Sequence, residues 1–217
     1  MGFLDLIFPP RCGGCAAYGA TWCGGCAAQV LSLPPGMVAG IPLITVGRLD
    51  GPLQRAIHRY KYRPRPELAN ALARCLAGAV RTVDVQIAVL TFVPLHPARE
   101  CERGFNQAER LARRLGEALG LPVIAGLSRI RATPAQVGLG EAERRANVVG
   151  AFRWSAAQPP PDGLALVDDV CTTGATLAAG AEAVARSGGS IRAFLALARA
   201  QTLPALAVTL PGQSTCP

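Results

Sequence analysis

Apolar residues along the chain recur in two patterns, one typical of helices and the other of buried strands. The helical spacing predicts helices over residues 53–62, 68–76 and 106–120, and a last helix that begins between Thr173 and Thr176 and ends at Gly188. Continuous apolar runs predict strands over 163–167, 87–93 and 190–198, with shorter strand-like pieces at 122–125 and 149–154. Such unbroken runs are typical of parallel strands covered on both faces, as in α/β proteins. Pro34-Pro35-Gly36 predicts a linker over 31–40.

One strand leads directly into a segment of carboxylate and hydroxyl side chains. The run 163–167 ends in Asp168 and Asp169, and a turn of small and hydroxyl residues, 172–176, follows. In open α/β sheets ligands bind beyond the carboxyl ends of the strands, so both acids are expected to face a ligand. The first N–H groups of the next helix attract anions, and the threonine hydroxyls add donors. The segment therefore predicts a sugar-phosphate site, with ribose hydroxyls or hydrated Mg²⁺ beside the acids. A helix cap with an ordinary turn is the structural alternative.

Four cysteines near the start of the chain have the spacing of metal ligands. Cys12 and Cys15 form one Cys-x2-Cys pair, and Cys23 and Cys26 form a second, within a stretch rich in Gly and Ala. Four thiolates on tetrahedral zinc would stabilise a segment that has little bulk to bury, and the metal would be structural because no ligand position stays open. Two disulfides and a redox pair are the alternatives. The first ten residues lack the features of a signal peptide, so we expect a cytoplasmic protein, in which disulfides are disfavoured.

Composition narrows the class of protein. A chain of 217 residues with 50% hydrophobic and 17% charged residues can form one full core with a small appendage, which excludes disorder for most of it. No apolar run approaches the ~20 residues of a membrane span. The formal net charge is +8, and four thiolates with one Zn²⁺ would lower it to +6. This excess still favours polyanions, including nucleic acid.

Two further segments have a mixed character. Residues 58–65 interleave cations with aromatic rings, which is typical of single-strand binders and equally of a solvated helix end. Residues 129–147 form a long polar connection with four arginines, and such connections are usually functional or disordered. Cys171 lies directly before the 172–176 turn, and its thiol suggests that the site is sensitive to oxidation.

Several motifs follow one another in a recognisable order. They are Phe8-Pro9-Pro10-Arg11-Cys12 with the three later cysteines, Lys61-Tyr62, Val93-Pro94-Leu95-His96-Pro97, Arg103-Gly104-Phe105-Asn106-Gln107, Arg131-x-Thr133-x-x-Gln136, Arg144-x-x-Asn147-Val148, and the segment 168–176. The last is similar to the phosphoribosyl pyrophosphate (PRPP) signature of type I phosphoribosyltransferases. Together the motifs resemble the ComF family of competence-associated, phosphoribosyltransferase-like proteins over nearly the whole chain.

The resemblance implies a fold and a role for each motif. It implies a type I phosphoribosyltransferase fold, a central mostly parallel sheet with flanking helices, over 36–200, a small four-cysteine zinc module with its linker over 1–35, and a tail over 201–217. The implied site residues are Asp168 and Asp169 as catalytic acids; Thr172, Thr173, Gly174, Ala175 and Thr176 for the 5′-phosphate; Pro94, Leu95, His96, Arg99 and Arg103 for the pyrophosphate; Arg131, Thr133, Gln136, Arg144 and Asn147 in a flexible lid; and Cys12, Cys15, Cys23 and Cys26 for zinc. A purely structural His96 and an ordinary surface loop in place of the lid are the alternatives.

The resemblance also implies a function. It implies binding of PRPP with Mg²⁺, pentosyl transfer, and support of single-stranded DNA uptake in natural transformation, with a competence helicase as a candidate partner. A non-catalytic, PRPP-sensing adaptor for a helicase or DNA, and a nucleobase salvage transferase, are the alternatives. The acceptor nucleophile and the oligomeric state stay open at this point.

Overall fold

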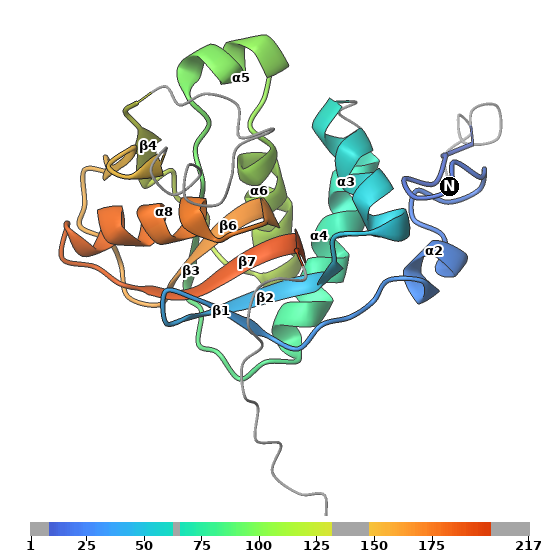
Figure 1. The fold of residues 1–217 in the computed structure, drawn as a ribbon, viewed down its shortest axis with the longest axis horizontal. Helices are drawn as coiled ribbons and strands as arrows, with labels where there is room; N and C mark the ends of the chain where they lie inside the picture. The colour runs from blue at the N-terminus through green and yellow to red at the C-terminus, as the bar shows by residue number, and fades with distance from the viewer. Residues whose placement is uncertain (1–8, 63–65, 132–147, 201–217) are drawn as a thin grey trace, which may run out of the picture.

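A five-stranded sheet forms the centre of the molecule (Figure 1). The computed structural model describes residues 9–62, 66–131 and 148–200, without the side chain of Arg103. In the order in which they pair, the strands are β1 (Gly36–Val38), β2 (Ile41–Arg48), β7 (Ile191–Arg199), β6 (Leu164–Cys171) and β3 (Val89–Phe92). Strands β2, β7, β6 and β3 run parallel, and β1 pairs antiparallel to β2. The expected α/β fold with a central, mostly parallel sheet is confirmed.

Helices cover both faces of the sheet. They are α2 (Gly24–Ala28), α3 (Gly51–Tyr62), α4 (Pro66–Arg81), α5 (Pro97–Arg103), α6 (Gln107–Leu119) and α8 (Ala175–Ala185). Helices α4 and α6 pack together on one face, whereas α8 lies on the other beside a small hairpin of β4 (Leu127–Arg129) and β5 (Phe152–Trp154) (Figure 1). Helix α3 stands at the carboxyl edge of the sheet, next to the four-cysteine segment. None of the helices in the described residues is long and apolar enough to cross a lipid bilayer.

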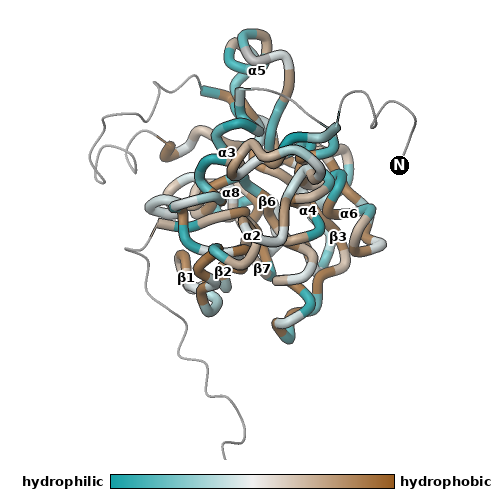
Figure 2. Tube along the Cα trace, turned by 90° about the vertical axis from the view of Figure 1, so that its right-hand side faces the viewer, coloured by the Kyte–Doolittle hydropathy of each residue, from teal (hydrophilic) through white to brown (hydrophobic). Residues whose placement is uncertain are grey.

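The core consists of the apolar runs seen in the sequence. Residues 164–167 and 193–198 are fully or almost fully buried, as expected for central parallel strands. Figure 2 shows the apolar colour along β2 and β7, in the interior of the molecule. Helices α3, α6 and α8 begin and end within three residues of the predicted positions, whereas α4 continues five residues past the predicted 76 and the short helices α2 and α5 were not predicted. Asn106 caps α6 by accepting from Ala108 N at 2.9 Å, and Gly120 ends it in the left-handed region at φ 71°.

Three expectations about strands need correction. The strand-like piece predicted over 122–125 forms only a single bridge, between Val123 and Leu90, and strand β4 begins two residues later, at Leu127. The predicted linker over 31–40 contains β1, which forms a hairpin with β2, a strand that the sequence did not predict. The strand predicted over 163–167 continues to Cys171, because residues 168, 170 and 171 pair with β7. Asp168 and Asp169 therefore belong to the last part of β6. Since successive strand residues point to opposite faces, the two acids lie on opposite sides of that strand.

Candidate functional site

A cavity of about 520 Å³ opens at the carboxyl ends of the parallel strands. Six segments contribute to its lining: the end of α3, the loop after β3, helix α5, the start of α6, strand β4, and β6 with the turn that follows. The polar residues among the lining are Lys61, Tyr62, Arg99, Asn106, Gln107, Arg129, Asp168, Asp169, Thr172, Thr173 and Thr176. This is the position at which α/β sheets bind ligands.

The two acids differ in their surroundings. The Nζ atom of Lys61 lies 3.1 Å from Oδ2 of Asp169, and both side chains are largely buried. The backbone N–H of Asp169 donates to Oδ1 of Asp168 at 2.7 Å. Burial, and next the charge of Asp169, raise the pKa of Asp168 to about 7, although this hydrogen bond, Lys61 and Arg129 act in the opposite direction. One acid thus has a counterion, and the other holds its proton near neutral pH.

The turn after β6 forms part of the wall of the same cavity. All five residues from Thr172 to Thr176 line the cavity, and α8 begins at Ala175. Gly174 caps α8 at φ 78°, in the left-handed region, and a Cβ atom there would lie 2.6 Å from Cγ1 of Val38 on β1. Glycine is therefore required twice, by its backbone conformation and by the hairpin packed against it. The open backbone of this turn next to a helix N-terminus suits an oxyanion.

Two arginines also line the cavity. Arg99 comes from α5 and Arg129 from β4, and both line the cavity. Burial, and next the nearby charge of Arg99, lower the pKa of Arg129, whereas Asp168 acts to raise it. Two guanidinium groups close to each other in a partly buried cavity favour an anionic ligand.

The expected pyrophosphate segment is only partly at the cavity. Leu95 and Arg99 line it, but within the described part of the chain Pro94 and His96 do not. His96 instead caps α5, because its Nδ1 atom accepts from the backbone N–H of Ala98 at 3.3 Å. The side chain of Arg103 lies outside the described part of the structure.

The predicted lid falls mostly on residues that the structure does not describe. Arg131 is described, and its guanidinium donates to the carbonyl of Val149 at 2.9 Å. Thr133, Gln136, Arg144 and Asn147 lie outside the described residues.

Sequence reasoning assigned no role to four residues that line the cavity: Lys61, Asn106, Gln107 and Arg129. Asn106 joins two elements, since its Nδ2 atom donates to the carbonyl of Val93 at 3.1 Å while its Oδ1 atom caps α6. Gln107 contacts α3, where its carbonyl accepts from the Tyr60 hydroxyl at 2.7 Å. The first three residues belong to the motifs Lys61-Tyr62 and 103–107, which was the signal that pointed to them.

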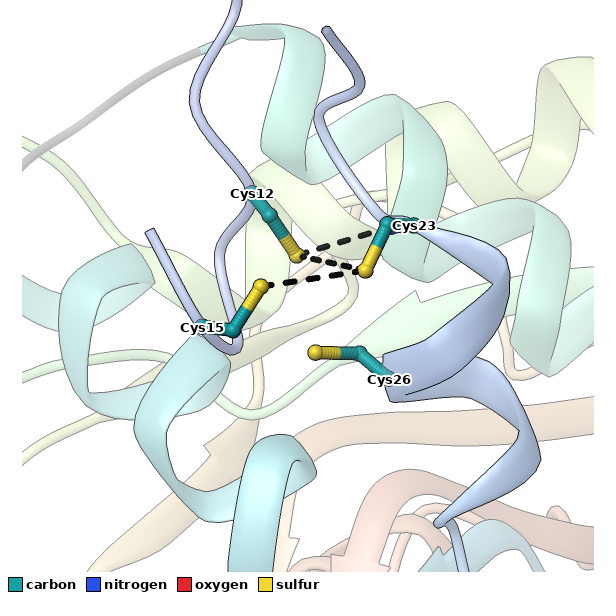
Figure 3. A group of neighbouring side chains, drawn as sticks. All are labelled: Cys12, Cys15, Cys23 and Cys26. Atoms are coloured by element: carbon teal, nitrogen blue, oxygen red, sulfur yellow. Dashed lines mark hydrogen bonds between the residues drawn. The ribbon is translucent and has the colours of Figure 1, made fainter. Parts of the chain in front are cut away.

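The four cysteines form a compact sulfur cluster (Figure 3). Their Sγ atoms lie within 4.8 Å of one another. The Cys12–Cys23 distance is 3.6 Å and the Cys15–Cys23 distance is 3.8 Å. With Zn–S bonds of about 2.3 Å, sulfurs at the corners of a tetrahedron lie about 3.8 Å apart. The donor set and its spacing therefore fit a four-coordinate metal ion.

The electrostatics of the cluster also favour a cation. Burial acts to raise the pKa of the Cys12 thiol, but backbone N–H groups of Cys15, Cys23 and Gly14 point at its sulfur and together lower that pKa. Burial and the three neighbouring sulfurs raise the pKa of Cys26. Four adjacent sulfurs cannot all ionise without a positive charge between them, and a metal ion supplies that charge.

Cys171 is not placed to react readily. The side chain is 2% exposed. Burial, and next the charge of Asp168, raise its pKa to about 12. Because the thiolate is the reactive form, this position argues against the predicted sensitivity to oxidation.

Comparisons with known proteins identify relatives of similar length. No family model matches the chain. The chain is 35% identical over 189 residues to DNA utilization protein YhgH of Salmonella typhimurium, which covers 83% of this chain and 79% of that relative. It is 34% identical over 194 residues to DNA utilization protein YhgH of Escherichia coli K12, an alignment that covers 86% of this chain and 81% of that relative. It is 32% identical over 179 residues to competence protein F of Haemophilus influenzae, with 78% and 70% covered.

The solved structures include one with a partial likeness. A glutamine PRPP amidotransferase from B. subtilis, complexed with ADP and GMP, has a TM-score of 0.42 and 20% identity, over 63% of this chain and 29% of that chain. The family assignment therefore depends on the sequence relatives and on the motifs that the fold brings together. On these grounds the chain belongs to the ComF family, together with competence protein F and the DNA utilization proteins YhgH.

Proposed function

We propose that this protein binds PRPP in the acid-lined cavity and acts in the use of incoming single-stranded DNA. The observation that carries the proposal is the junction of β6 and α8. There, two carboxylates, a glycine with positive φ and three threonines line one cavity at the carboxyl edge of a parallel sheet. PRPP needs such a set, because it combines ribose hydroxyls with a 5′-phosphate and a pyrophosphate.

Each part of the cavity has a role in this proposal. Asp168 and Asp169 hold the ribose hydroxyls, and the 172–176 turn holds the 5′-phosphate through its backbone N–H groups and hydroxyls. Arg99 and Arg129 receive the pyrophosphate, with Leu95 beside them, and this assignment replaces His96 and Pro94 as its main contacts. The residues 131–147 serve as a lid that excludes water once PRPP is bound.

The proposed chemistry is pentosyl transfer. When pyrophosphate leaves the ribose, positive charge grows on the ring, and carboxylates held nearby stabilise that charge. Mg²⁺ bound with PRPP would neutralise pyrophosphate charge, and Asp168 and Asp169 are the oxygen donors that suit it.

The four-cysteine cluster is proposed as a zinc site of structural type. All four positions of a tetrahedron are taken by cysteine sulfur, so no position is open for a substrate. Zinc supplies the charge that holds four thiolates together in a segment with few apolar side chains.

Three features support single-stranded DNA as the partner: the names of the relatives, the net charge and an exposed aromatic ring. Relatives carry the names DNA utilization protein and competence protein F, and the chain has a formal net charge of +8. Tyr62 lies at the cavity with 61% of its surface exposed, and its ring packs against His58 with centroids 4.8 Å apart. Exposed rings next to cations are the surface on which unpaired bases stack.

Release of pyrophosphate from PRPP and Mg²⁺ tests the proposal. The measurement uses the full-length protein with single-stranded DNA and, separately, with a panel of nucleobases. Release that depends on DNA supports the proposal, release that depends on a base supports nucleobase salvage, and binding without release supports a PRPP-sensing adaptor for a helicase or DNA.

A matched pair of variants tests the site itself. Asp169→Asn removes a carboxylate from the cavity, whereas Asp84→Asn removes an exposed one elsewhere. We expect Asp169→Asn to weaken PRPP binding at least tenfold, measured by calorimetry, and Asp84→Asn to leave it unchanged. Equal affinities of the two variants would refute the site.

A further inference from the structure

One helix contacts both the sulfur cluster and the cavity. In Figure 1, α3 stands between the N-terminal segment that contains the cysteines and the ends of β6 and β7. On the side of the cluster, Nη1 of Arg59 donates to two backbone carbonyls, Cys12 O at 2.8 Å and Gly13 O at 2.7 Å. One turn earlier, Nε of Arg55 donates to Gly14 O at 2.8 Å. Three successive carbonyls of the Cys12–Cys15 loop are thus bound by α3.

The loop also packs tightly against its neighbours. A Cβ atom on Gly13 would lie 2.6 Å from a methyl carbon of Leu68 on α4 and 3.3 Å from Cβ of Ala56 on α3. A Cβ atom on Gly14 would lie 2.6 Å from Sγ of Cys26. The backbone of the loop is thus closely packed against α3, α4 and Cys26, so a change in its conformation would be transmitted to α3.

The same end of α3 supplies a cation to the cavity. Lys61, two residues beyond Arg59, pairs with Asp169. Tyr60 between them is fully buried, and its hydroxyl donates to the carbonyl of Gln107, whose Nε2 atom in turn donates to the carbonyl of Lys61 at 3.4 Å. The last turn of α3 is therefore fixed on one side by the cysteine loop and on the other by the start of α6.

We propose that Arg59 is a positioning residue that couples the metal state of the cysteine cluster to ligand affinity in the cavity, through α3 and the Lys61–Asp169 pair. This inference rests on the proposed function, because the ligand used to detect it is PRPP. A metal ion holds the Cys12–Cys15 loop in one conformation, and the loop carbonyls then hold Arg59. With Arg59 held, Lys61 stays on Asp169 and adds its positive charge to the phosphate-binding cavity. Without the metal, the loop loosens, Lys61 is held less firmly, and PRPP binds more weakly.

Linkage makes the coupling measurable from both ends. If zinc raises PRPP affinity by a factor, PRPP must raise zinc affinity by the same factor. Such couplings are typically about 5- to 150-fold. The experiment compares PRPP affinity, with Mg²⁺ present, of the zinc-loaded and zinc-free full-length protein, and zinc affinity with and without PRPP by competition with a zinc-selective chelator. We expect the two ratios to agree and to exceed fivefold.

A matched pair of arginine variants locates the coupling. Arg59→Gln removes the bonds to the cysteine loop, whereas Arg81→Gln removes a bond of the same kind, Nη2 to Ala118 O at 2.6 Å, at the far end of α4. In Arg59→Gln, the ratio of PRPP affinities with and without zinc and the ratio of zinc affinities with and without PRPP should both fall toward one. Arg59→Lys should restore part of each ratio. Arg81→Gln should keep the wild-type ratios. Equal loss in Arg59→Gln and Arg81→Gln would overturn the proposal, since it would indicate general destabilisation.

A double-mutant cycle provides a second test, which uses only zinc-loaded protein and so does not require the zinc-free form to fold. If Arg59 acts through Lys61, the double variant Arg59→Gln/Lys61→Met should bind PRPP no more weakly than Lys61→Met alone. Fully additive losses would overturn the coupling. If the wild-type protein binds PRPP equally well with and without zinc, the coupling is wrong while the proposed function stands. Failure of the wild-type protein to bind PRPP at all would overturn both.

Discussion

Asp168 is the residue at which burial and function conflict most clearly. Its carboxyl group lies at the carboxyl edge of the sheet, beside a second acid, and its pKa is raised to about 7 by burial and by Asp169. Free aspartate has a pKa of 3.8, so the folded protein holds this proton over a range in which the unfolded chain has lost it. A cation that enters with PRPP would favour the ionised form.

The raised pKa predicts opposite pH dependences for stability and binding. The contribution of protonated Asp168 to the free energy of unfolding is fully present below about pH 4 and is lost as pH rises through about 7. Affinity for PRPP with Mg²⁺ should rise over the upper part of the same range, since the carboxylate is the form that binds. Denaturant titrations and calorimetry between pH 5 and 8 measure both trends.

The matching variant is Asp168→Asn, which cannot ionise. Its free energy of unfolding should lack the decline between pH 4 and 7, and its PRPP affinity should lack the rise. An Asp168→Asn protein with the same pH dependence as the wild type would assign the titration to another group.

At the scale of residues, sequence motifs identify groups that are close along the chain. The acids, the 172–176 turn and the four cysteines follow from local spacing, and the structure brings each set together. Lys61 and Arg129 come from distant segments, so their approach to the acids depends on the fold. The sequence left the role of His96 open between a ligand contact and a structural one, and in the structure its side chain caps α5.

At the scale of elements, the hairpin of β1 and β2 supports the 172–176 turn. Val38, at the end of β1, is 6% exposed and lies against Gly174, where a Cβ atom would come within 2.6 Å of it. The hairpin thus packs against the 172–176 turn on the side that faces away from the cavity, and the other side of the turn lines the cavity. A strand that the sequence did not predict is in this way part of the site.

Gly174→Ala is expected to damage binding more than folding. Alanine at φ 78° is strained, typically by about 1 kcal/mol or more, and its Cβ atom would push the turn away from Val38 toward the cavity. We expect at least a tenfold loss of PRPP affinity with a modest drop in melting temperature, measured by calorimetry and thermal denaturation.

Gly188→Ala is the control for backbone strain alone. Gly188 also has positive φ, at 81°, but nothing lies within 4 Å of a Cβ atom placed there. This variant should lose a similar amount of stability and keep its affinity for PRPP. An equal loss of affinity in both variants would contradict the role assigned to the Val38 contact.

The predicted and missed elements have physical reasons. Helices α3, α4 and α6 carry regular apolar spacing with clear ends, so the sequence predicts them well. Strand β2 is interrupted by Pro42 and Gly47, which weaken its strand signal. Strand β6 was predicted too short, because two adjacent carboxylates are a usual sign that a buried strand has ended, whereas here the pairing with β7 continues past them.

At the scale of the whole molecule, the excess of positive charge has a measurable consequence. A net charge of +8 favours contacts with phosphate groups, and such contacts make the affinity for nucleic acid fall as salt rises. For single strands the slope of log affinity against log salt is about −0.7 for each phosphate contact. Binding of a labelled oligothymidylate, followed by fluorescence anisotropy over a range of salt concentrations, gives this slope.

The same measurement separates the contribution of base stacking to DNA affinity from that of phosphate contacts. Tyr62→Ala should lower the affinity about 5- to 150-fold, the range expected when one base loses an aromatic partner, and leave the salt slope unchanged. Leu31→Ala, at an exposed apolar residue of the linker, should alter neither. A changed slope in Tyr62→Ala would show that the ring acts through phosphate contacts instead.

The position of the two acids on opposite sides of β6 also limits the shape of what the cavity can accept. A ligand that touches both carboxylates must straddle the tip of one strand, about the width of a single polypeptide backbone. A long flat molecule lying along either face would meet only one of them. The ligand proposed above, a compact five-membered ring with hydroxyl groups on one edge and charged arms on the others, meets this requirement.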